Sequence, residues 1–147
     1  MTTDAIVFTE DQLRIIRESA EKAYPAEACG LITGRATDDS RVVVHKVIEA
    51  ENLLAADRQD RFEVDPATRI QVEKACRGTE FSLVAHYHSH PDHPAEPSET
   101  DRERAYEPNL IWVIAGVTEE TATEIKAHWL DQDGTAFAEI DLIIDPA

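Results

Sequence analysis

Apolar and polar residues alternate along the chain in two periods, one of about two residues and one of about 3.6. A short apolar run at 5–8 (AIVF) indicates a strand, and Thr9 and Gln12 then form the capping-box pattern that begins a helix. The apolar face of that helix repeats every three or four positions, at Leu13, Ile16, Ala20 and Ala23. Pro25 should end it. The first part of the chain is therefore predicted to be a strand followed by an amphipathic helix.

The rest of the chain is predicted to be mostly strands. The expected strands are 28–34 (ACGLITG), 41–50 (RVVVHKVIEA), 61–64 (RFEV), 81–90 (FSLVAHYHSH), 109–117 (NLIWVIAGV), and a hairpin of 121–131 and 134–144 around Asp133-Gly134. Asp65 is placed to cap a second helix, with Pro66 at its first position and Gly78 after its end. We predict a mixed sheet with two or three helices packed on it, an α/β or α+β single domain over 1–147.

Composition supports a folded, cytoplasmic protein. A chain of 147 residues with 42% hydrophobic residues can bury the core of one domain. No apolar run approaches the roughly 18 residues of a membrane helix, and the first residues lack the positive start and apolar core of a secretion signal. Cys29 and Cys76 have no C-x-x-C spacing, so we expect packed thiols rather than disulfides or a thiolate zinc cage.

The charge excludes one large class of partners. A formal charge of -16 repels phosphates, so we expect no binding to DNA or RNA. Only 4 of the 14 basic residues are lysine. We interpret this composition as that of a halophilic cytoplasmic protein, because concentrated salt screens the repulsion between its acidic side chains. An acidic mesophilic protein is the alternative.

The segment 85–101 (AHYHSHPDHPAEPSETD) carries the candidate chemistry. On a strand, His86, His88 and His90 point to one face, with neighbours roughly 6.6 Å apart and the outer two about 13 Å apart. One metal ion, bound to nitrogen at about 2.0–2.1 Å, can hold His88 and one neighbour but not all three. The strand geometry therefore predicts a metal site with two of these histidines.

A third ligand should come from the loop after the strand. Pro91 ends the strand, and Ser98 is placed to cap a following helix that has Asp101 in its first turn. Such a loop folds back more easily onto His90 than onto His86. We predict His88, His90 and Asp101 as the metal ligands.

Two histidines and a carboxylate leave one zinc position open for water, as in catalytic zinc sites. Closure by Cys29 or Cys76 would make the site structural instead. A general base must accept the proton of the attacking water. Spacing leaves three candidates, Glu27, Glu96 and Glu99, with a modest preference for Glu27 because it stands where the core begins.

These segments resemble a known family. HSHPDHPAEPSETD has the form H-x-H-P-x6-S-x2-D, and PAEACGLITG places a glutamate before C-G-L-I. Together they resemble the JAMM motif of the MPN-domain zinc metalloproteases. The segment NLLAADRQDRFEVDP also resembles the Asn, Arg-Phe and Asp-Pro landmarks of that family. The likeness extends from Phe8 to about Val117.

The resemblance implies a zinc-dependent isopeptidase with a cytidine-deaminase-like α/β fold. It implies His88, His90 and Asp101 as ligands of one Zn²⁺ per chain, Glu27 as the base that activates the zinc-bound water, and Ser98 as a donor to the scissile carbonyl or its oxyanion. The minimal, acidic chain most resembles the haloarchaeal desampylases, which release ubiquitin-like small modifier proteins with Gly-Gly tails from lysines. The irregular 50–64 is the candidate edge for such a tail, and the protein is expected to be a monomer or homodimer.

Other functions stay open at this point. A relative of the family processes a ubiquitin-like sulfur-carrier protein with the same motif. A metal-free MPN scaffold would bind partners without catalysis, although no motif residue is missing here. Zinc nucleobase deaminases require H-x-E and P-C-x-x-C, which this chain lacks.

The remaining histidines are expected to play supporting roles. We predict His45 and His128 to be ordinary sheet residues, His86 to pack beside the metal ligands, and His93 to be a solvated loop residue that could also touch substrate.

Overall fold

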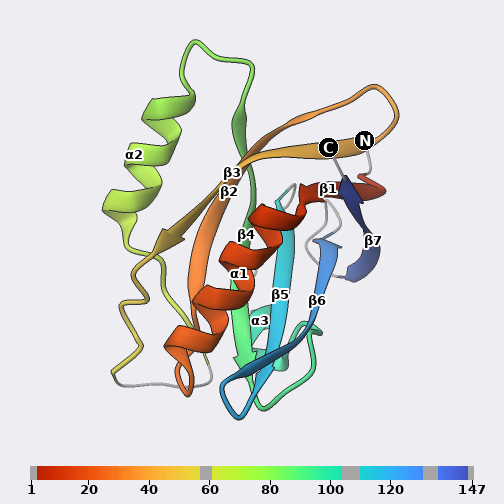
Figure 1. The fold of residues 1–147 in the computed structure, drawn as a ribbon. Coiled ribbons are helices and arrows are strands. Elements are labelled where there is room, and N and C mark those ends of the chain that lie inside the picture. The colour runs from red at the N-terminus through yellow and green to blue at the C-terminus, as the bar shows by residue number, and fades with distance from the viewer. Residues whose placement is uncertain (1–2, 57–60, 104–109, 131–135, 146–147) are drawn as a thin grey trace.

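The computed structural model describes residues 3–56, 61–103, 110–130 and 136–145. Figure 1 labels its elements, which in chain order are β1 (Ala5–Thr9), α1 (Glu10–Ala23), β2 (Cys29–Ala36), β3 (Arg41–Ala50), α2 (Pro66–Cys76), β4 (Ser82–Pro91), α3 (Glu99–Glu103), β5 (Ile111–Thr118), β6 (Thr121–Leu130) and β7 (Phe137–Asp145). The predicted α+β composition is confirmed. Among the described residues, no helix has the length and apolar character needed to cross a membrane.

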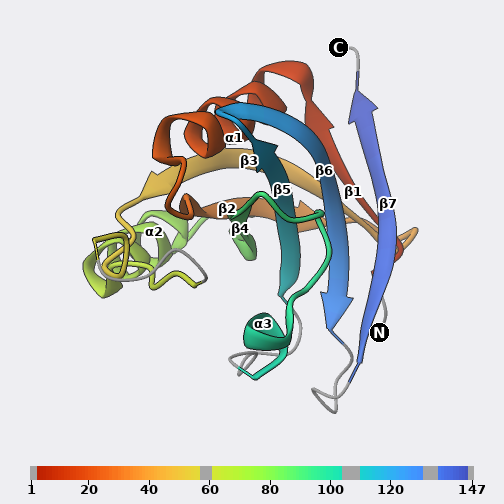
Figure 2. The ribbon, with the colours of Figure 1, turned by 90° about the horizontal axis from the view of Figure 1, so that it is seen from below.

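The strands form a mixed sheet that closes into a barrel, in the order β1-β3-β2-β4-β5-β6-β7. Three neighbouring pairs are parallel, β1 with β3, β1 with β7, and β4 with β5, and the others are antiparallel. Figure 2 shows the curvature of the sheet around α1. The mixed sheet was predicted, but its closure was not, because the parallel pairing of β1 with β7 joins the two ends of the chain.

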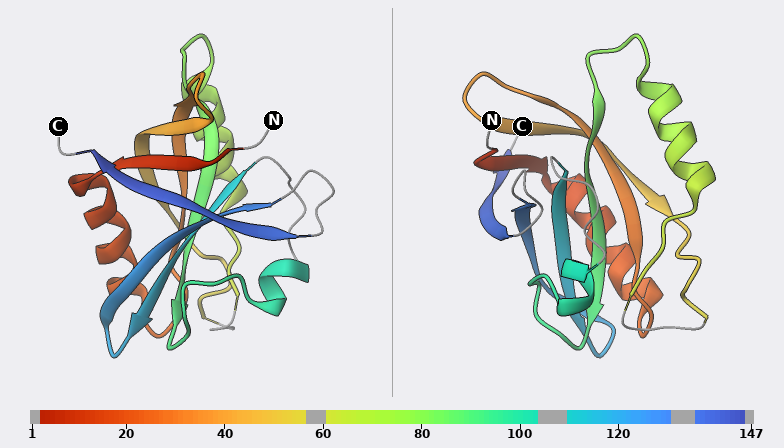
Figure 3. Two further views of the ribbon diagram at one scale, coloured as in Figure 1. Left: turned by 90° about the vertical axis from the view of Figure 1, so that its right-hand side faces the viewer. Right: turned by 180° about the vertical axis from the view of Figure 1, so that it is seen from behind.

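Helix α1 fills the concave side of the sheet. Thr9 and Gln12 make both bonds of the predicted capping box, and the side chain of Gln12 also donates to the carbonyl of Val44 on β3. The buried face of α1 carries Leu13, Ile16 and Ala20. Figures 1 and 3 show α2 on the opposite side of the sheet from α1. The hydrophobic core therefore lies between α1 and the strands.

Strand β4 has one face toward the core under α1 and the other face on the opposite side of the sheet. Ala85 and Tyr87 face α1, and the buried hydroxyl of Tyr87 makes a 3.0 Å hydrogen bond to Ser19 of α1. Tyr87 is also paired in register with Gly30 of β2, where an added Cβ would lie 2.1 Å from the tyrosine ring. The alternate residues His88 and His90 point to the other face. One strand thus carries core residues on one face and the candidate site on the other.

The segment after β3 differs from its prediction. The expected strand at 61–64 is absent, and only an isolated bridge joins Asn52 to Val64. The side chain of Asn52 supports this short pairing, because its Oδ1 accepts from the amides of Leu54 and Glu63. The predicted hairpin of β6 and β7 is present, while its turn at Asp133-Gly134 lies outside the described residues.

Candidate metal centre

The predicted metal ligands come together at the end of β4. Nε2 of His88 lies 3.2 Å from Nε2 of His90, and Oδ2 of Asp101 lies 3.2 Å from the first and 2.9 Å from the second. All three side chains are buried. His88 and His90 project from one face of β4, and Asp101 returns on α3 as the loop argument predicted.

The spacing of these atoms fits a tetrahedral metal ion. Ligand atoms held about 2.0–2.1 Å from a tetrahedral zinc are separated from one another by about 3.3 Å. The three observed separations of 2.9 to 3.2 Å are close to that value. Two imidazoles and one carboxylate are also ligands that zinc accepts. The donor set and its geometry therefore fit a metal ion at this point.

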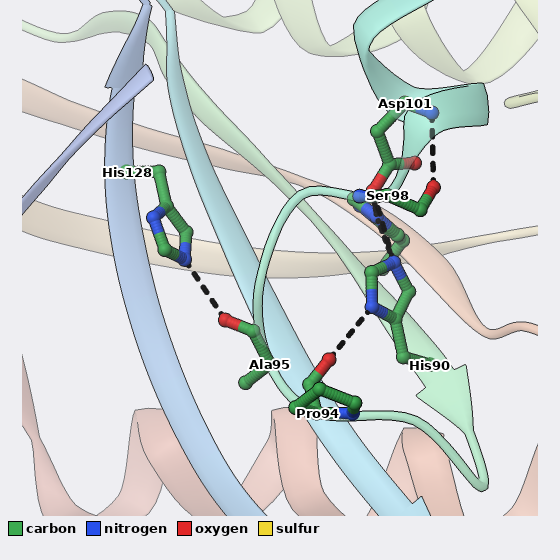
Figure 4. Close-up of polar contacts among 7 residues, drawn as sticks. His90, Pro94, Ala95, Ser98, Asp101 and His128 are labelled. Atoms are coloured by element: carbon green, nitrogen blue, oxygen red, sulfur yellow. Dashed lines mark hydrogen bonds and ion pairs between the residues drawn. The ribbon is translucent and has the colours of Figure 1, made fainter.

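Hydrogen bonds orient His90 as a ligand. Its Nδ1 donates to the carbonyl of Pro94 at 2.9 Å, so the neutral ring presents the lone pair of Nε2 to Asp101 (Figure 4). A lone pair facing a carboxylate needs a shared proton or a cation between them. Histidines that bind metals commonly donate their second nitrogen in this way. The ring of His88 is held by stacking on Phe62, at 4.4 Å between centroids, and by an edge contact with Trp112.

The electrostatics of the cluster follow from burial and mutual charge. Burial opposes ionisation of Asp101, but the two histidines and the amide of Ser98 outweigh it and hold the pKa of this carboxyl far below its ordinary value. Burial lowers the pKa of His88. Burial also acts to lower the pKa of His90, but its hydrogen bond to Asp101 and the carboxylate charge raise it overall. A buried carboxylate with two imidazoles thus forms a site that favours a cation.

Strand pairing brings Glu27 to the same place. Strand β2 pairs with β4 so that Cys29 lies opposite His88, and continuing this register two residues places Glu27 opposite His90. The carboxylate of Glu27 and the ring nitrogens of His88 and His90 lie within 4.8 Å of one another. Glu27 is 3% exposed, and its carbonyl accepts a 2.8 Å hydrogen bond from the side chain of Asn52.

The other two candidates for the base lie elsewhere. Glu96 is exposed, and its carboxylate binds the ammonium of Lys126 at 2.8 Å. Glu99 is exposed on the first turn of α3. The structure therefore brings only one of the three candidates, Glu27, into the buried cluster of described residues.

Ser98 and Asp101 form a reciprocal cap at the start of α3. The Ser98 amide donates to Oδ2 of Asp101 at 2.9 Å, and the Asp101 amide donates to Oγ of Ser98 at 3.0 Å (Figure 4). Because Oγ accepts in this bond, its own hydrogen remains available to a neighbouring acceptor. The predicted cap is thus observed, and it places a hydroxyl beside the carboxylate of the candidate metal cluster.

A pocket of about 420 Å³ opens next to the cluster. Its walls include Phe62 and Val64 from the segment after β3, His86 and Trp112 from the sheet, and Asp101 of α3. The ring of His86 packs edge-on against Trp112 at 4.5 Å, as expected for a residue beside the ligands. Residues 61–64 and Asp101 of the candidate metal cluster therefore line the same pocket.

The remaining candidates are placed as follows. His93 is exposed in the loop, and His45 is exposed on β3, where its ring stacks on Phe81. Both cysteines are free thiols. Burial and the nearby charge of Glu27 raise the pKa of Cys29 to about 12, so its thiol is protonated and packed as predicted.

Sequence reasoning assigned no role at the site to three residues around it. The side chain of Asn52 donates to the carbonyl of Glu27, and Oγ of Ser89 accepts a 2.7 Å hydrogen bond from the amide of Ala28. His128 of β6, predicted to be an ordinary sheet residue, is buried and bonds to the carbonyl of Ala95 at 2.9 Å. Ser89 lies in the buried end of β4, and His128 follows the buried Ala127 on β6. A polar residue next to apolar strand positions was the available signal for both.

Comparisons with known proteins agree with this architecture. The family model described as prokaryotic homologs of the JAB domain matches residues 9–131. A desampylase of Haloferax volcanii is 34% identical over 98 residues, which cover 67% of this chain and 68% of that protein. A CysO-cysteine peptidase of Mycobacterium tuberculosis is 27% identical over 86% of this chain and 84% of its own. A solution structure from Desulfitobacterium hafniense superimposes with a TM-score of 0.81 and 29% identity, covering 97% of this chain and 94% of the other.

Proposed function

The chain belongs to the family of prokaryotic JAB-domain homologs, and we propose that it is a zinc-dependent isopeptidase. Its substrates are ubiquitin-like small modifier proteins joined through a C-terminal Gly-Gly tail to a lysine of a target protein. The observation that carries the proposal is the convergence of His88, His90 and Asp101 at metal-ligand spacing, with Glu27 buried beside them.

The residues of the site divide into ligands and groups that handle protons. His88, His90 and Asp101 would hold the zinc, which supplies a Lewis acid that polarises the scissile carbonyl and acidifies water. Glu27 accepts the proton of the attacking water and returns it to the departing lysine amine. Ser98 donates its hydroxyl hydrogen to the carbonyl oxygen as negative charge develops there. The clustering of these side chains supports the proposed roles. The thiol of Cys29 contacts the carbonyls of Ala50 and Glu51, away from the cluster, which argues against a closed structural site.

The pocket suits an extended tail. Phe62, Glu63 and Val64 line it together with Asp101, so a chain lying in it would pass close to the candidate metal ligands. Glycines pass a narrow passage because they carry no side chain. We propose that the tail lies along the 50–64 segment, the candidate edge, whose described residues include an isolated bridge between Asn52 and Val64.

The choice of substrate follows the relatives. Similarity to a protein named desampylase supports cleavage of modifiers from lysines, and its source, Haloferax volcanii, agrees with the halophilic interpretation of the -16 charge. We place the protein in a salt-rich cytoplasm, as a single domain that works as a monomer or homodimer without nucleic acid. Similarity to a CysO-cysteine peptidase over 86% of the chain supports a second candidate, removal of cysteine from a ubiquitin-like sulfur carrier.

One experiment tests both candidates. The purified protein, in concentrated salt, is incubated with an isopeptide-linked modifier conjugate and with a sulfur-carrier adduct, with a chelator and after zinc is added back. We expect cleavage of the isopeptide conjugate that the chelator abolishes and zinc restores. Preferential cleavage of the adduct would favour the second candidate, and cleavage that survives full metal removal would refute the zinc-dependent site.

A further inference from the structure

The loop that carries the candidate site is held from the side by strand β6. Residues 92–98, termed here the metal-site loop, connect His90 at the end of β4 to Ser98 at the start of α3. Glu124, Lys126 and His128 are alternate residues of β6 and therefore lie on one face of that strand. Figure 4 shows His128 directed from β6 toward the loop carbonyl of Ala95.

All three side chains bond to two neighbouring residues of the loop. His128 Nε2 donates to the carbonyl of Ala95 at 2.9 Å, and the carboxylate of Glu124 accepts from the amide of the same residue at 3.1 Å. Lys126 binds the carboxylate of Glu96 at 2.8 Å. Both backbone polar groups of Ala95 are thus satisfied by side chains more than 25 positions away in the sequence.

The bond from His128 is the buried one of the three. His128 is 2% exposed and Ala95 is fully buried, whereas Glu124 is exposed. A buried carbonyl that loses its donor is not rescued by water, so the loop would shift to satisfy it. His128 therefore restricts the position of Ala95 more strictly than the two charged residues do.

The position of Ala95 matters because the preceding carbonyl orients a metal-binding residue. Pro94 accepts the hydrogen bond from Nδ1 of His90, and Ala95 follows it directly (Figure 4). Three residues later Ser98 begins the cap that holds Asp101. A shift of the loop at Ala95 would therefore move the partner of one metal ligand and the support of another.

We propose that His128 is a positioning residue, which fixes the metal-site loop and thereby the geometry of His90 and Ser98. It acts through the loop and touches neither metal nor substrate. Glu124 provides a weaker second support on the same residue of the loop. The inference rests on the proposed function for the metal and the reaction, and it adds a determinant of that site which lies on a different strand.

The test compares two substitutions at one position. His128→Phe keeps a ring but removes the donor, and His128→Gln keeps an N–H near the place of Nε2. Zinc affinity is measured by competition with a chromophoric chelator, and kcat and KM are measured on the isopeptide conjugate. We expect His128→Phe to weaken zinc binding by about 10-fold, within the range for loss of an outer-shell partner, and to lower kcat while KM changes little. His128→Gln should restore most of both.

Glu124→Ala provides a variant whose folding is not in question because the side chain is exposed. We expect Glu124→Ala to weaken zinc binding less than His128→Phe does. The control Glu139→Ala removes the same charge on β7, opposite His128, and should leave zinc binding unchanged. Folding is checked by near-ultraviolet circular dichroism of the tryptophans. The inference is overturned if folded His128→Phe has the zinc affinity and the kcat of the parent. If that variant does not fold, the inference is overturned when Glu124→Ala and Glu139→Ala have the same zinc affinity. A parent that binds no zinc would instead contradict the proposed function.

Discussion

The two faces of β4 are made of alternate residues of one short strand, yet they have opposite physical characters. Ala85 and Tyr87 lie against α1 in an apolar core, where the single polar atom of the tyrosine is paired with Ser19. His88 and His90 lie on the other face in a buried cluster with a carboxylate, where their Nε2 atoms contact each other and Oδ2 of Asp101. A period of two residues thus separates stability from chemistry within a single element.

Burial therefore has different consequences for the residues on the two faces of β4. Apolar burial on the α1 face stabilises the fold regardless of ligands. Buried imidazoles and a carboxylate on the other face gain little for the fold, because desolvation offsets their mutual attraction, but they are ready to bind a cation. Substitutions on the α1 face should therefore lower the free energy of unfolding, whereas substitutions on the histidine face should change metal binding and activity.

His90→Ala is expected to have the largest effect. It removes one of the proposed zinc ligands. Loss of an outer-shell partner lowers metal affinity by up to about 100-fold, so loss of a ligand should lower zinc affinity by more than this, and cleavage should be lost. Metal analysis after dialysis and cleavage of the isopeptide conjugate measure the two properties, and far-ultraviolet circular dichroism checks the fold. A variant that retains zinc and activity would show that the cluster is not the metal site.

Tyr87→Ala tests the opposite face. Loss of this fully buried ring should lower the free energy of unfolding by about 3–5 kcal/mol, measured by urea denaturation, while zinc content stays that of the parent at low temperature. The control Tyr87→Phe removes only the hydroxyl bond to Ser19 and should cost about 1 kcal/mol. Zinc loss from folded Tyr87→Ala would mean that the two faces are not independent.

Ser98→Ala separates chemistry from metal binding. Removal of the proposed donor to the developing oxyanion should lower kcat by about 10²–10³-fold, with zinc content unchanged. Ser98→Thr keeps a hydroxyl at the same helix cap and is the matched control. Equal activity of the alanine variant and the parent would remove Ser98 from the proposed reaction and leave it as a cap.

His86→Ala should have the smallest effect, although His86 shares a face with the two proposed ligands. Its ring packs against Trp112 and lines the pocket, so its loss should alter KM more than kcat and leave zinc bound. Metal content and steady-state kinetics measure this. Loss of zinc from this variant would favour His86 over His90 as the partner of His88.

Local features of the sequence predicted much of the fold and of the site. The alternation in AHYHSH placed the histidines on one face, Pro91 ended the strand, and the Ser98 cap brought Asp101 back to His90. These steps depend on residues within a few positions of one another. The helix caps at Thr9 and Asp65 were predicted for the same reason.

Long-range contacts were beyond the same reasoning. Glu27 reaches the site because β2 pairs with β4 in a register that local patterns do not specify. The contact of His128 with Ala95 spans 33 positions, and closure of the barrel depends on pairing between the first and last strands. The 61–64 segment did not form the expected strand because, among the described residues, its pairing with the residues after β3 extends over only the bridge between Asn52 and Val64.

The most direct test of the account is a comparison of Glu27→Gln with the parent, in which zinc content and cleavage of an isopeptide conjugate are measured on the same samples. The substitution keeps the shape of a side chain buried beside His88 and His90 but removes its basicity. We predict about one zinc per chain in both proteins and a kcat lowered by about 10²–10⁴-fold in the variant. Equal cleavage by the two proteins, or a folded parent that binds no zinc, would contradict the account.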